Sequence, residues 1–79
     1  MFCFVGYNKD MDRYDELLKV DSLQKAERRI PAFQAALSRD ELRDATCEPY
    51  DWVEVWDEED DNGLNDIYIH ANNVLYGRP

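Results

Sequence analysis

The chain has 79 residues and a formal net charge of −9, with 44% hydrophobic and 13% aromatic residues. This length allows one domain with a small core, and the aromatic content argues against a disordered chain. The negative charge disfavours direct binding to nucleic acid or anionic membranes. We expect a single domain over residues 1–79, with a charge-neutral half at 1–47 and an acidic half at 48–79.

The first elements in chain order are a strand and a short helix. Phe2–Tyr7 is aromatic and β-branched and looks apolar on both faces, which predicts a central strand. Apolar residues then recur at helical spacing up to about Lys19, which predicts a helix capped by Asp10 or Asp12. These apolar residues are Met11, Tyr14, Leu17 and Leu18.

A longer helix is predicted to follow Asp21, its candidate N-cap, because Gln24 three residues later nearly completes a capping box. Its apolar stripe continues for four turns and comprises Leu23, Ala26, Ile30, Phe33 and Leu37. Pro31 lies inside the stripe and either kinks this helix or divides it in two. A last helical piece is predicted from the capping box at 38–41 to about Ala45.

The acidic half reads as strands. Tyr50–Asp57 alternates, with Trp52, Glu54 and Trp56 on one face and Val53 and Val55 on the other. A turn region at 58–65 has its tightest point at Asn62–Gly63. The return strand is Asp66–Ala71, and 74–76 is a candidate fourth strand.

This order of elements predicts an α+β fold. A small antiparallel sheet, formed by the N-terminal strand, the C-terminal hairpin and the candidate fourth strand, would carry two or three helices on one face. Cys3 and Cys47 form no disulfide framework and no metal motif, so two buried thiols are expected, with a single bridge as the alternative. Without a recognisable targeting segment or membrane-length apolar run, we expect a cytoplasmic protein.

The acidic charge is concentrated in the second half of the chain. Residues 1–43 balance eight basic against eight acidic residues, whereas 44–77 contain ten acidic residues and no Lys or Arg. The ten are Asp44, Glu48, Asp51, Glu54, Asp57, Glu58, Glu59, Asp60, Asp61 and Asp66. A local patch of this sign attracts basic protein surfaces or cations.

The run Asp57–Asp61 has three interpretations. It is a solvated hairpin tip, a weak calcium site, or a row of carboxylates that occupies a cleft built for nucleic acid. In an extended segment, successive carboxylates lie about 3.3 Å apart, close to the spacing of phosphates along a DNA strand. An EF-hand is excluded, because Ile69 falls where a bidentate Glu is required.

The aromatic residues of the acidic half, Trp52 and Trp56 with Tyr50, Tyr68 and Tyr76, form one group that is a candidate for the core or for an interface. Trp52 and Trp56 lie on the same predicted face as Glu54, so that face cannot be fully buried without a partner for the carboxylate. His70 is the single histidine and has no neighbouring nucleophile in the sequence pattern. We therefore expect no enzyme activity, no cofactor and no metal.

The chain is short, acidic and rich in aromatic residues, and it carries the Asp57–Asp61 run with flanking acids. In these features it resembles the small anti-CRISPR and anti-restriction proteins with which phages and mobile elements inhibit bacterial defence. The resemblance implies that the protein binds stoichiometrically to a defence complex in the bacterial host cell and blocks the binding of DNA to that complex. The complex would be a ribonucleoprotein or another basic nucleic-acid-binding protein. The candidate partner-binding residues are Glu54, Trp56, Asp57, Glu58, Glu59, Asp60, Asp61 and Asp66.

Three other functions stay open. An antitoxin or immunity protein would neutralise a basic nuclease by the same electrostatics. A calcium-responsive acidic hairpin would bind the cation at its turn. An accessory domain would use its acidity for solubility alone. The oligomeric state is open as well.

Overall fold

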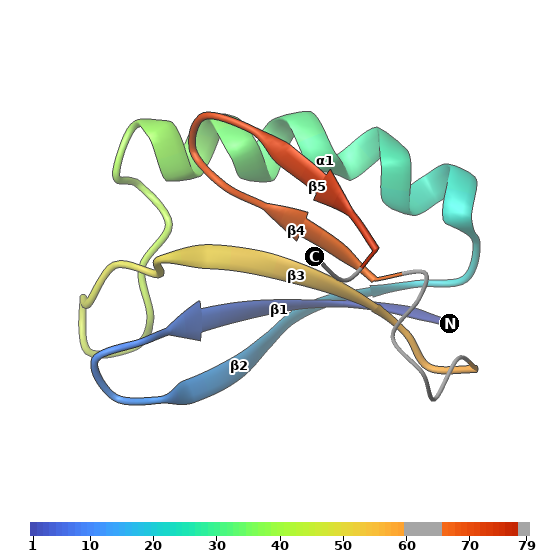
Figure 1. Cartoon of the computed structure of the whole chain (residues 1–79). Coiled ribbons are helices and arrows are strands. Elements are labelled where there is room, and N and C mark those ends of the chain that lie inside the picture. The colour runs from blue at the N-terminus through green and yellow to red at the C-terminus, as the bar shows by residue number, and fades with distance from the viewer. Residues whose placement is uncertain (60–65, 78–79) are drawn as a thin grey trace.

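The structure, a computed structural model, describes residues 1–59 and 66–77. Five antiparallel strands form one sheet in the order β2-β1-β3-β4-β5, and one helix covers one face of it (Figure 1). The elements are β1 (Phe2–Asn8), β2 (Arg13–Val20), α1 (Leu23–Ser38), β3 (Trp52–Asp57), β4 (Ile67–Ile69) and β5 (Val74–Tyr76). The prediction of a small sheet with two or three helices is therefore wrong, because the described chain has a larger sheet and a single helix.

The segment predicted as the first helix is strand β2. The chain reverses just before it, where the Asn8 side-chain oxygen accepts hydrogen bonds from the backbone N–H groups of Asp10 and Met11 at 3.0 and 3.2 Å. β2 then pairs with β1 from end to end, with one bulge. The bulge interrupts the two-residue alternation of β2, so its apolar residues fall at spacings that resemble those of a helix. Pairing with the central strand overrides this local pattern.

α1 is one continuous helix. Its N-cap is Ser22, one residue later than predicted, and the Ser22 hydroxyl oxygen accepts a hydrogen bond from the Lys25 backbone N–H at 3.2 Å. Pro31 lies inside the helix on its exposed side and does not divide it. The helical piece predicted at 38–45 is not formed, because Asp40 adopts a φ of 57° that ends the helix. No helix of the described chain has the length and apolar content to cross a membrane.

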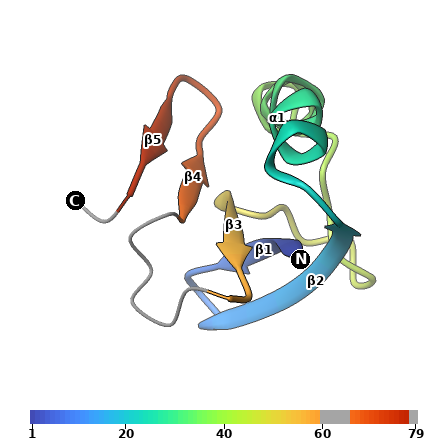
Figure 2. The same ribbon diagram turned by 90° about the vertical axis from the view of Figure 1, so that its right-hand side faces the viewer.

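The core lies between α1 and the covered face of the sheet (Figure 2). Its largest fully buried side chains come from three neighbouring strands and are Phe4, Val53, Val55 and Ile69. Phe4 stacks on Phe33 of α1 with ring centroids 4.7 Å apart. The alternation predicted for the strand at 50–57 is confirmed, since its two valines face the helix and its tryptophans face away.

The loop after α1 is tied to the β1–β2 hairpin. The Tyr50 ring lies directly on Gly6, where an added Cβ would be 2.7 Å from a ring carbon. The Tyr50 hydroxyl donates a hydrogen bond to the Asp15 carboxylate at 2.8 Å. Arg13 forms ion pairs with Asp15, at 3.3 Å, and with Asp44 of the loop. Tyr50 thus extends the core beyond the helix.

Candidate functional site

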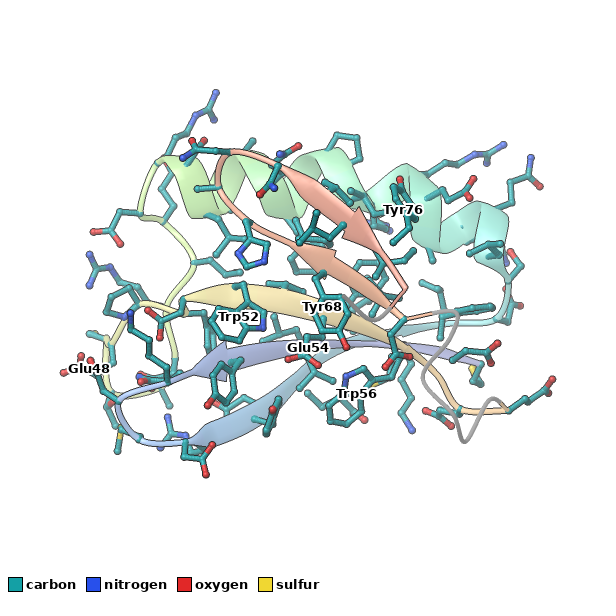
Figure 3. All side chains as sticks on the ribbon, in the orientation of Figure 1. Glu48, Trp52, Glu54, Trp56, Tyr68 and Tyr76 are labelled. Carbon is teal, nitrogen blue, oxygen red and sulfur yellow. The ribbon has the colours of Figure 1, made fainter. Side chains whose placement is uncertain are left out.

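The face of the sheet turned away from α1 is rich in aromatic side chains, and no described element packs on it (Figure 2). Strand register places five aromatic residues there, Tyr7, Tyr14, Trp52, Trp56 and Tyr68. Together with Glu54 at its centre we call this surface the open face. Figure 3 shows Trp52, Glu54, Trp56 and Tyr68 gathered on the same side of the sheet.

Glu54 is the central residue of the open face. The indole N–H of Trp52 donates to one carboxylate oxygen and that of Trp56 to the other, both at 2.9 Å. This geometry follows from strand alternation, which puts residues two apart on one face. Glu54 is 7% exposed. Across the part of the chain that the structure describes, no basic nitrogen lies within ion-pair distance of its carboxylate.

Four aromatic rings form a continuous path beside this carboxylate. Tyr7 contacts Trp52 and Tyr14, with ring centroids 4.6 and 4.5 Å apart. Tyr14 continues to Trp56 at 5.5 Å, and His70 adjoins the other end at 5.5 Å from Trp52. The negative ring faces and the carboxylate together make the open face attractive to cations.

Charged groups lie at both ends of the open face. At one end the Lys19 ammonium lies 3.1 Å from Glu58 and 3.5 Å from Glu16. The pKa of Lys19 is raised, and the hydrogen bond to Glu58 is the largest cause. At the other end the Tyr7 hydroxyl donates to Asp12 at 2.9 Å. That hydrogen bond and partial burial raise the pKa of Tyr7 to about 12.

The predicted acidic run is only partly described. Asp57 ends β3, and its carboxylate accepts a hydrogen bond from the Glu59 backbone N–H at 3.0 Å, while Glu58 pairs with Lys19. Asp60 and Asp61, like the predicted turn at 62–63, lie outside the described residues.

The other acidic residues of this half do not form one continuous surface. Glu54 and Asp66 are largely buried, at 7% and 8% exposure, so neither belongs to an exposed acidic patch of the kind that the sequence predicted. Asp44 is used inside its loop, where it accepts hydrogen bonds from Thr46 and from the Glu48 backbone N–H. Figure 3 shows Glu48 at the end of the sheet opposite Trp56.

The sequence prediction found Trp52, Trp56 and Tyr68 but missed Tyr7 and Tyr14 as members of this surface. Both tyrosines depend on β2 being a strand, since Tyr7 and Tyr14 are direct partners across the β1–β2 pair. Tyr50 and Tyr76, which the sequence grouped with the tryptophans, lie elsewhere: Tyr50 rests on Gly6, and Tyr76 is 69% exposed on the last strand.

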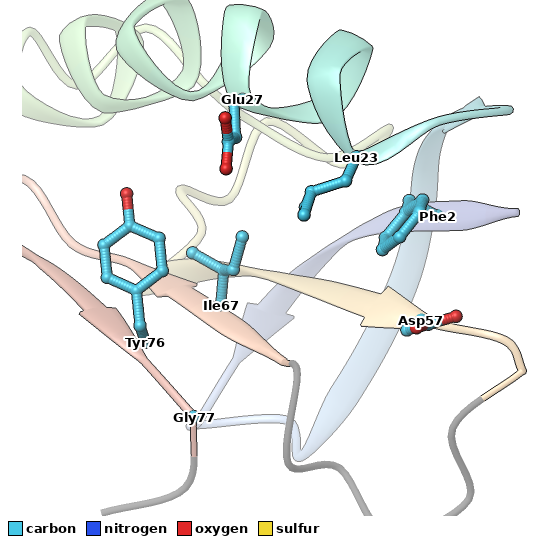
Figure 4. Close-up of a pocket in the computed structure, with 7 residues that line it drawn as sticks. All are labelled: Phe2, Leu23, Glu27, Asp57, Ile67, Tyr76 and Gly77. Atoms are coloured by element: carbon cyan, nitrogen blue, oxygen red, sulfur yellow. The ribbon is translucent and has the colours of Figure 1, made fainter.

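A pocket of about 360 Å³ lies between α1 and the end of the sheet (Figure 4). It is lined by Phe2, Leu23, Ile67, Tyr76 and Gly77 and by the two acidic residues Glu27 and Asp57. None of its described lining residues is a buried polar side chain of the kind that orients a small ligand. The open face is therefore the stronger candidate site.

Neither cysteine is in a disulfide bond, and only Cys3 is buried, so the expectation of two buried thiols is wrong for Cys47. Burial, and then the hydrogen bond from its thiol to Glu16, raise the pKa of Cys3 from 9.0 to about 11. A thiol with a raised pKa in the folded state stabilises the fold fully below the unfolded value and loses that contribution as pH rises toward the folded value.

We therefore expect the urea midpoint to fall between about pH 9 and about pH 11, the interval over which the Cys3 thiol resists ionisation only in the folded state. Urea titrations at fixed ionic strength across pH 8–12 measure this. Cys3→Ala should abolish the decline between about pH 9 and pH 10 and reduce it up to about pH 11, leaving the decline above about pH 10 that Tyr7 and Tyr50 cause, because the pKa of each tyrosine is raised from 10.0 to about 12. An identical pH profile in that variant would contradict the assignment.

Within the described residues, no group of three or more His, Cys, Asp or Glu side chains is arranged to hold a metal ion. A scan against protein-family models, a search of curated proteins and a search of solved structures each returned no match to this chain. The candidate function accordingly comes from the open face and the charge distribution.

Proposed function

We propose that this protein is a non-enzymatic inhibitor that binds a Lys/Arg-lined surface of a nucleic-acid-binding protein or ribonucleoprotein and competes there with the nucleic acid. The observation that carries the proposal is a sheet face with two tryptophans and three tyrosines that no described element covers, on a chain of net charge −9. Trp and Tyr dominate the binding energy of protein interfaces, and negative charge steers the chain to basic surfaces.

The acidic end of β3 supports this function. The half-buried Asp57 and the exposed Glu58 and Glu59 follow Trp56 directly, so carboxylates border one end of the open face. Aromatic sheet faces also bind single-stranded nucleic acid by stacking, but those surfaces carry basic grooves along the phosphates. Here the carboxylate at the centre of the open face and the net charge oppose a phosphate backbone. A cationic protein surface fits both features.

The class of target follows from the resemblance to phage-encoded inhibitors. We place the protein in the bacterial cytoplasm, bound to a defence complex of CRISPR type whose DNA channel it blocks. An antitoxin or immunity role differs in the partner alone, which would be a basic nuclease, and identifying the partner separates these two.

The test is retention of a partner from bacterial lysate by the tagged protein, followed by elution with duplex DNA. The variant Asp57→Asn/Glu58→Gln/Glu59→Gln removes three charges beside the open face. The control Asp10→Asn/Glu27→Gln/Glu41→Gln removes three charges from exposed positions elsewhere. We expect the wild type and the control to retain a nucleic-acid-binding partner that DNA displaces, and the first variant to bind it about ten-fold or more weakly.

Equal retention by both triple variants would show that the acidic end of β3 takes no part in binding. A partner that DNA and raised salt fail to displace would contradict competition for a nucleic-acid surface.

A further inference from the structure

The Glu54 carboxylate is a buried negative charge with no described cation. Burial removes most of its hydration, and two neutral indole N–H groups of the described residues donate hydrogen bonds in its place. A carboxylate has about four lone-pair positions for hydrogen bonds, so two remain after both indoles have donated. Burying such a charge is costly, and an apolar residue of similar size would fill the position at lower cost. The binding of an external cation beside Glu54 would therefore lower the cost of burying this carboxylate.

The rings beside Glu54 limit which cation fits. The rings of the path Trp52–Tyr7–Tyr14–Trp56 lie tilted against one another beside the carboxylate, and Tyr14 within this path is 47% exposed. A guanidinium is planar, stacks on aromatic rings and donates hydrogen bonds to a carboxylate at the same time. An ammonium is more strongly hydrated and has no flat face, so it gains less from such a surface.

We propose that the open face binds an arginine side chain of the partner, which stacks on the rings and donates to the free lone pairs of Glu54. This inference rests on the proposed function and names the group that is recognised. Lys19, the basic side chain that the strand register places on this face, is engaged by Glu16 and Glu58 and does not fill the position. Charge complementarity thus selects a cation from outside the described chain.

Trp52 and Trp56 are the two tryptophans of the chain, so their indole N–H signals in proton–nitrogen NMR report on this site directly. The probes are three short peptides, identical except for one central arginine, lysine or citrulline. Citrulline has the shape of arginine without its charge. We expect the arginine peptide to shift both indole signals saturably, the lysine peptide to bind at least about five-fold more weakly, and the citrulline peptide to leave both signals in place.

Glu54→Gln keeps the shape of the side chain and removes its charge, and we expect it to reduce arginine-peptide binding to the citrulline level. Glu27→Gln, at an exposed position of α1 away from the open face, is the matched control and should bind as the wild type does. If Glu54→Gln fails to fold, Tyr14→Leu tests the ring path without altering the carboxylate. We expect this variant to bind the arginine peptide about two- to five-fold more weakly, which is the effect of losing roughly one cation–ring contact.

Equal shifts with arginine and citrulline peptides would overturn the inference, as would arginine binding that survives in Glu54→Gln or indole shifts with a single-stranded oligonucleotide. The lysate experiment separates this result from the proposed function. A DNA-displaced partner that is retained equally by Glu54→Gln leaves the function standing and defeats the arginine site. Arginine-selective peptide binding, together with no partner that DNA displaces, supports the arginine site and defeats the proposed function.

Discussion

Replacing Trp52 and Trp56 together by phenylalanine is expected to destabilise the fold by about 3–6 kcal/mol. Each indole N–H donates a hydrogen bond to the charged Glu54 carboxylate at 2.9 Å. Hydrogen bonds to charged groups contribute roughly 1.5–3 kcal/mol each, and losing both leaves a buried carboxylate without a donor. A chain of this length has a total stability of about 4–12 kcal/mol, so the double variant should lose at least about a quarter of it and be close to unfolded if the total lies at the lower end.

Phenylalanine keeps a ring at each position, so a double-mutant cycle separates the hydrogen bonds from ring packing. Urea unfolding of each single variant, followed by circular dichroism, should give a loss of about 1.5–3 kcal/mol. In a Glu54→Leu background the same tryptophan changes should cost about 1 kcal/mol or less, because no carboxylate remains to be satisfied. Equal losses in both backgrounds would assign the effect to packing.

Gly6→Ala is expected to destabilise the fold by about 1–3 kcal/mol, although it adds only one methyl group. In the interior of a strand, alanine is ordinarily favoured over glycine. At this position the new Cβ would lie 2.7–2.8 Å from three atoms of the Tyr50 ring. The ring cannot withdraw freely, because its hydroxyl is hydrogen-bonded to Asp15 and its loop is held by Arg13 and Asp44.

The measurement is the change in unfolding free energy for Gly6→Ala in two backgrounds. With Tyr50 present we expect the full loss, whereas with Tyr50→Ala the same change should be neutral or stabilise by up to about 1 kcal/mol. A loss that persists without the ring would place the strain elsewhere in β1.

Several elements were predictable from the sequence because their patterns are strictly local. The apolar stripe of α1, the alternation of β3 and the aromatic run of β1 each agree with the structure. β2 was mispredicted because its bulge imitates helical spacing, and Asp15 and Glu16 within it are poor strand formers. The helix predicted at 38–45 failed because a capping pattern there has too little apolar surface to bury.

Part of the candidate site was predictable from the sequence, and part of it required the tertiary structure. By itself the sequence determined the acidic imbalance between the two halves of the chain, and it determined that Trp52, Glu54 and Trp56 share one face, because alternation fixes side-chain direction along a strand. The tertiary structure was needed to show that no described element covers this face, that the Glu54 carboxylate accepts hydrogen bonds from both indoles, and that Tyr7 and Tyr14 complete the ring path. Those features require strands distant in sequence to pair in one register, and non-local pairing is chosen by the packing of the whole chain.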